Sequence, residues 1–409
     1  MSDAQFDLVV FGATSFVGQI LCQYLTDTYG VDGDLKWAAA GRSKDKLEQV
    51  KAQLGQAGSA LPLLTADAND DASLDSLCAQ TRVVVSTVGP YALYGEPMIR
   101  ACVTSGTDYC DLTGEVQWIA AMLEEYEDQA KQSGARIVHC CGFDSIPSDM
   151  GTYFLQQQAQ ARFKAPATRV KMRVKVAKGG VSGGTVASMM NIAEEAAGDP
   201  ALRKKLANPY LLCPPNHGFN ARQDSISMPR KDEDFDAWAA PFVMDAINSR
   251  IVHRSNALNG KAYGDNFTYN EAMLAGPGMG GRMKALGIGT GTGLFFAAAA
   301  IKPTRWLLNK FVVPQPGEGP SPEAQKAGFY DIRFFGVTDN NDSIRVKVTG
   351  DADPGYGSTA KLLGQAAACL AQDLPADAPG GFWTTASLLG DSLLKRLQEK
   401  AGMTFNVID

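Results

Sequence analysis

Hydrophobic positions in the first 150 residues alternate between short apolar runs and longer periodic stretches. Runs of strand length occur at 6–11, 35–40, 61–66, 83–88, 109–112 and 137–141. Between them apolar residues recur three or four positions apart, which is typical of amphipathic helices. The clearest helical stretch is 115–133, which stops at Gly134. Six strands alternating with helices predict an α/β fold of the Rossmann type, with a doubly wound parallel sheet.

The pattern changes after about residue 150. Apolar and basic residues alternate at 170–176, which predicts a strand with one solvated face. The runs 329–337 and 343–349 predict a hairpin, and helical periodicity returns at 358–370 and 389–397. We therefore expect a dinucleotide-binding domain at 1–150, an inserted α+β domain for substrate or dimerisation at 151–350, and helices at 351–409.

Composition narrows the class of protein. The chain has 38 basic and 44 acidic residues, so 38 − 44 gives a net charge of −6, which argues against a nucleic-acid partner. Eight cysteines without a C-x-x-C pair, and three separated histidines, predict reduced thiols in a cytoplasmic protein and no metal site. The first apolar run follows no basic region, so we expect a strand and no signal peptide.

The first strand leads into Gly12-Ala-Thr-Ser-Phe-Val-Gly18, and an amphipathic helix follows. Strand, glycine turn and helix form the context of a dinucleotide loop, in which N–H groups at the helix start hold a pyrophosphate. The alternative is an α/β domain that binds no nucleotide. The contacts predicted here are Gly12, Thr14, Ser15, Phe16, Val17 and Gly18.

The end of the second strand indicates which dinucleotide is bound. No acidic residue occurs between Leu35 and Arg42, where NAD-binding domains usually place one for the ribose 2′-hydroxyl. A guanidinium instead suits a 2′-phosphate, so we predict NADP(H). The alternative is a solvated loop arginine. The residues predicted at this end of the cofactor are Gly41, Arg42, Ser43 and Asp67.

Two later strand ends should face the reacting half of the cofactor, because ligands bind at the carboxyl edge of such sheets. The fourth strand ends at Val88, Gly89, Pro90 and Tyr91. Tyr91 and Tyr94 either contact the ring or substrate, or pack in the core. After the sixth strand come Asp144, Ser145, Ser148 and Asp149, which either cap the next helix or face the substrate.

The segment 285–301 has 17 residues without a charge and lies between Lys284 and Lys302. It is shorter than the roughly 20 residues of a bilayer span and is rich in glycine. We expect a helix that is buried or lines the substrate site. An interfacial membrane anchor, with peripheral lipid contact through 285–310, and a true span are the alternatives.

Several segments resemble a known family, the saccharopine dehydrogenase-like oxidoreductases, in the branch that contains trans-acting enoyl reductases. They are VVFGATSFVG, AAGRSKDKL, VSTVGPYALYGEP, DYCDLTGE, CGFDSIPSDMG, SGGTVASM, PFVMDAINSRIVHRSNAL and PTRWLLNKFVVPQPGEGPS, which together cover most of the chain. Ser15 is a departure, because the family more often has glycine there. The resemblance also implies that the C-terminal helices pack back on the dinucleotide-binding domain.

The resemblance implies NADPH-dependent reduction of a double bond conjugated to a carbonyl, on a small-molecule or acyl-chain substrate, in a protein that could form a homodimer. Tyr94 or Tyr109 is the predicted hydrogen-bond donor or acid, and Asp144 is predicted to orient groups near the nicotinamide. One alternative is oxidation of an amino-acid adduct, whose carboxylates would need cations at Arg250, Arg254 and Lys261. Another is a noncatalytic NADPH-binding, lipid-associated protein.

Overall fold

The computed structural model describes residues 4–179, 183–311, 319–375 and 377–408. The resembling segments at 182–189 and 303–321 lie partly outside these ranges. The chain divides into two compact units. The first comprises Met1–Asp144, Gln315–Pro320 and Gly355–Ala401, and the second comprises Ser145–Pro314, Ser321–Pro354 and Gly402–Asp409.

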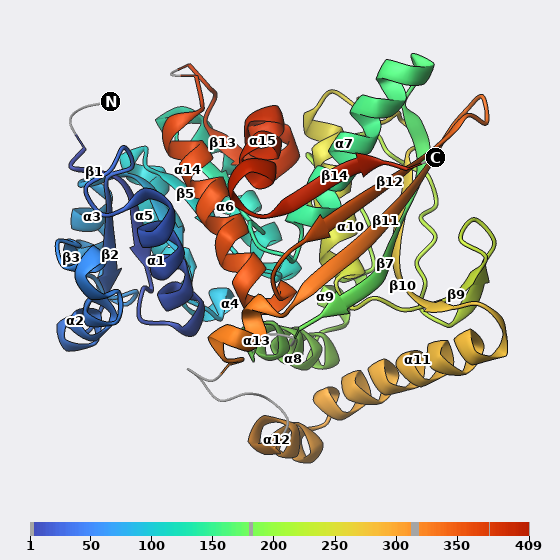
Figure 1. Ribbon diagram of the computed structural model, residues 1–409, viewed down its shortest axis with the longest axis horizontal. Helices are drawn as coiled ribbons and strands as arrows, with labels where there is room; N and C mark the ends of the chain where they lie inside the picture. The colour runs from blue at the N-terminus through green and yellow to red at the C-terminus, as the bar shows by residue number, and fades with distance from the viewer. Residues whose placement is uncertain (1–3, 180–182, 312–318, 376, 409) are drawn as a thin grey trace. The chain divides into compact units, whose positions relative to one another are not determined.

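A parallel sheet forms the centre of the first unit (Figure 1). Its order is β13-β6-β5-β4-β1-β2-β3, with parallel pairing throughout. This confirms the predicted Rossmann-type sheet, because the strand order reverses at β1. The strands are β1 (Phe6–Phe11), β2 (Trp37–Gly41), β3 (Leu63–Thr65), β4 (Thr81–Ser86), β5 (Asp108–Asp111), β6 (Arg136–Val138) and β13 (Gly381–Trp383).

Helices cover both faces of this sheet because each strand is followed by an amphipathic segment. Helix α14 packs beside α1 and against β1, β4 and β5, and nearly all of its residues are buried. Its alanines and Gly364 permit that close approach. The helices of this unit are α1 (Phe16–Tyr29), α2 (Lys44–Gln53), α3 (Asp71–Cys78), α4 (Tyr91–Tyr94), α5 (Glu96–Ser105), α6 (Val116–Ser133), α14 (Thr359–Gln372) and α15 (Gly390–Lys400).

The second unit is built on a mixed sheet with the order β14-β12-β11-β7-β10-β9-β8. Among the described strands of this second sheet, only β7 and β10 pair in parallel. Helices α7 and α10 pack together, α7 against β7, β11 and β12 and α10 against β10. The strands are β7 (Ala167–Lys178), β8 (Arg230–Asp232), β9 (Ala237–Ala240), β10 (Thr268–Gly276), β11 (Phe329–Thr338), β12 (Ser343–Gly350) and β14 (Met403–Val407).

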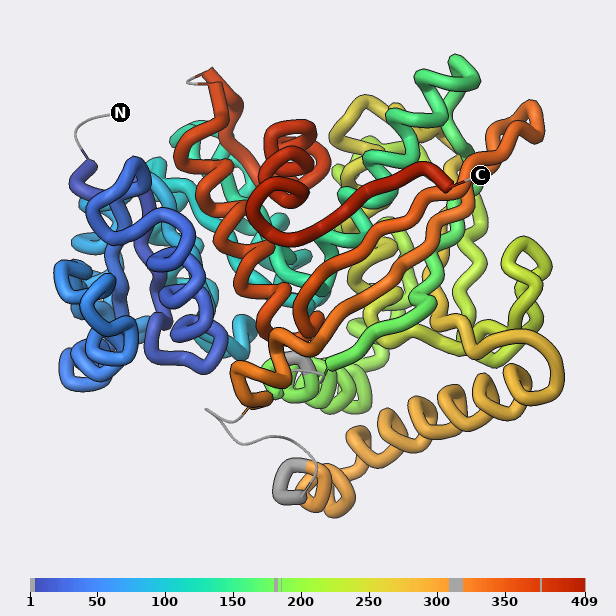
Figure 2. The backbone as a smooth tube through the Cα atoms, in the orientation of Figure 1, coloured from blue at the N-terminus to red at the C-terminus, as the bar shows by residue number. Residues whose placement is uncertain are grey.

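The helices of the second unit include one very long one. They are α7 (Ile146–Phe163), α8 (Gly183–Gly198), α9 (Pro200–Leu206), α10 (Asp245–Leu258), α11 (Gly278–Ala300), α12 (Lys302–Phe311) and α13 (Pro322–Lys326). Figure 2 shows α11 as a single rod at the border of this unit. Among the described residues of α11, only Gly281, Ala285 and Ala299 are buried. The expectation of a buried helix at 285–301 is therefore wrong. Within the described part of the chain, one face of the helix packs on apolar partners, which include Ala240, Ala275 and Trp238.

The periodicity at 358–370 and 389–397 indicated a purely helical C-terminal region. The structure shows that this region also contains two strands. It adds β13 to the first sheet and β14 to the second. The three residues of β13 are too few to show an alternating pattern. In β14 the alternation is present, with Met403 and Phe405 buried and Thr404 exposed, but it covers a short stretch at the end of a helix.

Candidate functional site

The turn between β1 and α1 requires glycine at both ends. Gly12 has φ +89°, and a Cβ there would lie 2.7 Å from Thr87 Oγ1. A Cβ on Gly18 would lie 2.2 Å from the carbonyl oxygen of Gly12. These contacts hold the start of α1 tightly against the strand, so its free N–H groups point at a cradle that suits a pyrophosphate.

Ser15 takes part in the turn as the N-cap of α1. Its Oγ accepts a hydrogen bond from Gly18 N at 2.9 Å and lies 2.9 Å from Thr87 Oγ1. The serine hydroxyl thus accepts a hydrogen bond from a helix N–H group that would have to bond to water if residue 15 were glycine. The neighbouring Thr14, Phe16 and Val17 are half-buried, so they flank the turn with part of their surface accessible.

The end of β2 lies beside the glycine turn. A Cβ on Gly41 would lie 3.8 Å from Thr14 Oγ1, and Arg42 follows with its side chain exposed. Ser43 caps α2 by accepting from Lys46 N at 3.4 Å. Asp67, after β3, forms a turn in which its carboxylate accepts from Asn69. An exposed guanidinium at this edge fits a 2′-phosphate.

The loop after β4 is held by a buried carboxylate. The backbone N–H groups of Tyr91 and Ala92 each donate to Glu115 at 2.9 Å, and Glu115 is fully buried. The Tyr91 hydroxyl donates to Ser86 O at 2.9 Å, which supports the packing alternative for that tyrosine. Ahead of it, Val88 and Pro90 are half-buried and Gly89 is exposed. Among the two tyrosines of this loop, only Tyr94 is exposed, at 39%.

Tyr109 lies in the interior of the sheet. It is fully buried, and its hydroxyl has no hydrogen-bond partner among the described residues. Burial raises the pKa of Tyr109 well above its ordinary value, so the hydroxyl keeps its proton. The ring packs edge-on to His139, with 6.0 Å between centroids.

Asp111 ties the ends of β5 and β6 together. Its Oδ2 lies 2.7 Å from His139 Nδ1, and its Oδ1 accepts from the N–H groups of Thr113 and Cys140 at 3.1 Å each. Cys140 adopts the left-handed φ of 61°, which is uncommon for a residue other than glycine. Two consecutive loops at the carboxyl edge of the sheet therefore depend on one buried carboxylate.

Sequence reasoning did not assign Asp111, Glu115 or His139 to the site. The available signal was an acidic residue at the carboxyl end of a predicted strand, in the segment DYCDLTGE. A charged group at the end of a buried strand must find partners in the adjoining loops.

Asp144 lies in the loop after β6, and its carboxyl has an unusually high pKa. Its side chain is half-buried, and the surrounding protein withdraws enough water to raise the pKa of its carboxyl to about 7; the charge of Asp111 adds to the effect. Phe143 N donates to Thr359 Oγ1 at 3.0 Å, and a Cβ on Gly142 would lie 3.2 Å from Thr359 Cγ2. The start of α14 thus fixes the backbone that carries this carboxyl.

The remaining polar residues of this segment lie inside the second unit. Ser145 donates to Asn248 Oδ1 at 2.9 Å, and Asn248 donates to Glu271 at 2.8 Å. Asp149 accepts a hydrogen bond from Ser255, and Ser148 is buried beside Glu271. Burial raises the pKa of Glu271 to about 8. These groups form an internal network between α7, α10 and β10.

The cations proposed for an amino-acid adduct have other partners. Arg250 donates to the carbonyl oxygens of Ala246 and Leu206, and Arg254 donates to that of Leu212. Lys261 pairs with Asp265 at 2.7 Å. Among the described residues, these three cations are therefore engaged by groups of the protein itself, although Arg250 Nε has no hydrogen-bond partner there.

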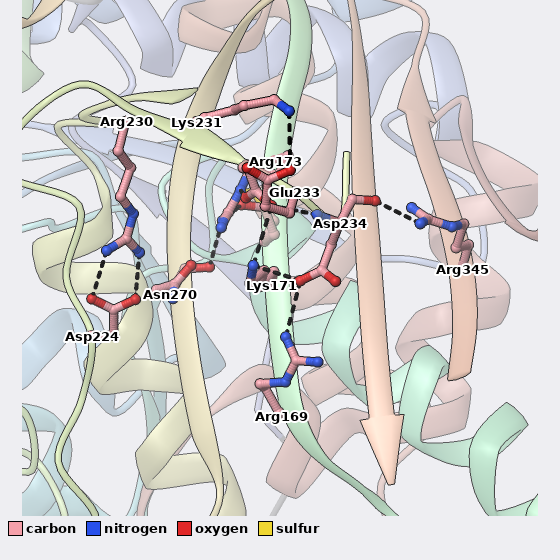
Figure 3. Close-up of polar contacts among 12 residues, drawn as sticks. Arg169, Lys171, Arg173, Asp224, Arg230, Lys231, Glu233, Asp234, Asn270 and Arg345 are labelled. Carbon is pink, nitrogen blue, oxygen red and sulfur yellow. Dashed lines mark hydrogen bonds and ion pairs between the residues drawn. The ribbon is translucent and has the colours of Figure 1, made fainter. Parts of the chain in front are cut away.

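A second set of cations lies on β7, and these cations form ion pairs with carboxylates (Figure 3). Arg173 is fully buried and donates to Asp232 at 2.6 Å. Lys171 lies 3.1 Å from Asp232 and 2.5 Å from Asp234, which also pairs with Arg169 at 2.9 Å. The ion pairs fasten the loop after β8 to the sheet, so they are structural.

Comparisons with known proteins agree with this geometry. Residues 8–138 match the family model of the saccharopine dehydrogenase NADP binding domain. A Mycobacterium tuberculosis protein assigned to the trans-acting enoyl reductases is 39% identical over 402 residues, covering 96% of this chain and 95% of that protein. The trans-acting enoyl reductase of Mycobacterium ulcerans is 34% identical over 416 residues, covering 98% and 97%.

A solved structure supports the fold of the whole chain. Saccharopine dehydrogenase (L-Glu forming) from Saccharomyces cerevisiae aligns with a TM-score of 0.53 at 13% identity, covering 98% of this chain and 99% of that one. Fold, glycine turn and family model together define an NADP-dependent oxidoreductase. The chain belongs to the saccharopine dehydrogenase-like oxidoreductase family, in the trans-acting enoyl reductase branch.

Proposed function

We propose that this oxidoreductase reduces a carbon–carbon double bond conjugated to a carbonyl in an acyl, lipid-like substrate. The observation that carries the proposal is the near full-length similarity to trans-acting enoyl reductases. Bound NADPH supplies a hydride to the β-carbon. Negative charge then develops on the carbonyl oxygen, and a proton must reach the α-carbon.

In this proposal, three strand ends of the first unit each bind a different part of the cofactor. The turn from Gly12 to Gly18 and the start of α1 hold the pyrophosphate, as their close backbone contacts support. Arg42 binds the 2′-phosphate through its exposed guanidinium. The loop that Glu115 holds after β4 positions the nicotinamide, because it follows the central strands at the carboxyl edge.

Asp144 is our candidate for proton delivery. Because burial raises the pKa of its carboxyl to about 7, a substantial fraction carries a proton at neutral pH. Tyr109 also holds a proton, but its hydroxyl is fully buried, and Tyr94 is the more accessible of the two tyrosines. This gives Asp144 an acid's role in place of the orienting role expected from the sequence.

The test compares Asp144→Asn with Asp128→Asn, whose carboxylate is 91% exposed on α6. NADPH consumption is followed with a panel of enoyl thioesters and imines. We expect Asp144→Asn to lower kcat by roughly a hundredfold or more at unchanged NADPH affinity, with Asp128→Asn as wild type. The wild-type rate should fall as pH rises through about 7, because the protonated carboxyl is required.

Two results would count against these assignments. If the enzyme turned over the imines and none of the enoyl thioesters, the proposed substrate class would be wrong. A variant Asp144→Asn with the wild-type rate and pH profile would remove Asp144 from proton delivery and leave the substrate class standing.

A further inference from the structure

Helix α11 is apolar on two opposite faces. The inward face carries Ala285, which packs in a cluster with Ala240 and Ala275, and Trp238 and Ile288 lie against this cluster. The helix contacts β9, β10 and α8 of its own unit. This face therefore attaches the helix to its own unit around Ala285 and Ile288.

The outward face is a stripe of residues that are apolar except for one threonine, and no packing partner for their side chains is described. Its positions are spaced by four, three, four, four, three and four residues, which places them on one side of a helix, and all are exposed. Met279 is 67% exposed, Leu294 is 65% and Ile301 is 56%. The α11 stripe consists of Met279, Met283, Leu286, Thr290, Leu294, Ala297 and Ile301.

The next helix extends this apolar surface. Trp306 is 58% exposed and Leu307 is 48% exposed on α12. Thr304 and Arg305 hold the junction by hydrogen bonds to the carbonyls of Ala298 and Ala299. Isolated exposed apolar residues are common, whereas a stripe of several turns marks a surface that contacts something else.

The charged residues of the same segment are all basic. Residues 278–311 contain five basic and no acidic residues, although the whole chain has a net charge of −6. Lys284 and Lys302 are exposed beside the α11 stripe. Arg282 lies over the Trp238 ring, and Arg305 pairs with Glu194 at 2.7 Å. Apolar side chains flanked by cations complement a surface that is apolar inside and anionic at its border.

A second copy of the chain fits this surface poorly. Two copies packed face to face through this segment would bring their Lys284 and Lys302 side chains together, and the segment has no acidic residue to pair with them. A membrane crossing also fits poorly, although the helix is long and apolar enough for one. The inward face is already occupied by the unit's own sheet, so the helix cannot leave the protein to enter a bilayer upright.

We propose that α11 and α12 dock this enzyme on membranes that contain anionic lipids, with α11 parallel to the surface. The α11 stripe, Trp306 and Leu307 enter the boundary between headgroups and acyl chains, and Lys284 and Lys302 contact the lipid phosphates. The docking is independent of the substrate proposed above, since it rests on a surface of the second unit.

The experiment is flotation of the full-length protein with phosphatidylcholine vesicles, with and without phosphatidylglycerol. Leu294→Glu on the α11 stripe is compared with Leu93→Glu, because Leu93 is equally exposed at 63% in the first unit. We expect binding to the phosphatidylglycerol vesicles, release by high salt, a loss of roughly tenfold or more in Leu294→Glu, and no loss in Leu93→Glu. Lys284→Glu with Lys302→Glu should weaken binding to anionic vesicles alone.

Thermal unfolding and circular dichroism of each variant show that it is folded, and Leu307→Glu repeats the test at a second site. The proposal is overturned if the wild type stays with the soluble fraction at all vesicle compositions, or if Leu294→Glu floats as well as the wild type. It is also overturned if light scattering shows a dimer that Leu294→Glu dissociates while no vesicles are bound. Enzyme turnover enters none of these readouts, so docking and substrate class can fail separately.

Discussion

Replacing Gly18 by alanine should damage the cofactor turn even though alanine favours helices. Glycine to alanine in a helix gains up to about 1 kcal/mol of stability when nothing obstructs the new methyl group. At Gly18 the methyl carbon would lie 2.2 Å from the carbonyl oxygen of Gly12 and 2.9 Å from Ala13 Cα. Both are backbone atoms, which cannot rotate away, and overpacking of this kind costs about 1–3 kcal/mol.

The matched control is Gly287, which lies within α11 and has no described atom within 4 Å of its added Cβ. We expect Gly287→Ala to raise the free energy of unfolding by up to about 1 kcal/mol. Gly18→Ala should lower it by about 1–2 kcal/mol and weaken NADPH binding, because the start of α1 must move. Urea unfolding and titration calorimetry measure the two effects. Equal stability of both variants, with NADPH affinity intact in Gly18→Ala, would refute the role of the close contact.

Three further changes test other parts of the molecule. Arg42→Glu should weaken NADPH binding and spare NADH, since a carboxylate repels the 2′-phosphate; equal loss of both cofactors in calorimetry would remove that contact. Asp232→Ala leaves the fully buried Arg173 unpaired and should cost about 3–5 kcal/mol in urea unfolding, whereas Asp224→Ala breaks an exposed pair and should cost less than about 1 kcal/mol. Similar losses in the two would contradict the burial argument. Because burial raises the pKa of Glu271 to about 8, its contribution to stability is complete below the ordinary pKa of glutamate and is lost as pH rises through about 8. The unfolding temperature of the wild type should therefore fall as pH rises from about 4.5 to about 8 and show no further loss from this group above pH 8, whereas Glu271→Gln should change much less; parallel pH curves would show that Glu271 is not the group responsible.

The strands and helices of the first unit could be predicted because each buried strand is a separate apolar run closed by a polar or glycine-rich turn. Those runs predicted the order of the elements, and the glycine turn after β1 remains the prediction for the cofactor edge. Strand β13 escaped prediction, because three residues carry no period. Its place beside β6 depends on pairing over more than two hundred residues, which no local pattern records.

The chemical state of the candidate site was harder to predict. Asp144 and Glu271 are ordinary carboxyls in the sequence, and their raised pKa values arise from burial that only the assembled fold creates. Nothing in the sequence distinguishes Asp111 and Glu115 from other acidic residues, yet each accepts hydrogen bonds from backbone N–H groups of a different loop. For α11 the sequence indicated an apolar helix, but which face would remain without a partner depended on the packing of β9 and β10.

The hydroxyl of Ser15 has a consequence for how the cofactor is received. It joins the start of α1 to Thr87, which directly follows β4, and these hydrogen bonds help to fix the shape of the turn. A glycine at this position would leave that segment free to sample other conformations, and binding would have to freeze it. We therefore expect the turn of this chain to be preorganised, so that less conformational entropy is lost on cofactor binding than with glycine at position 15.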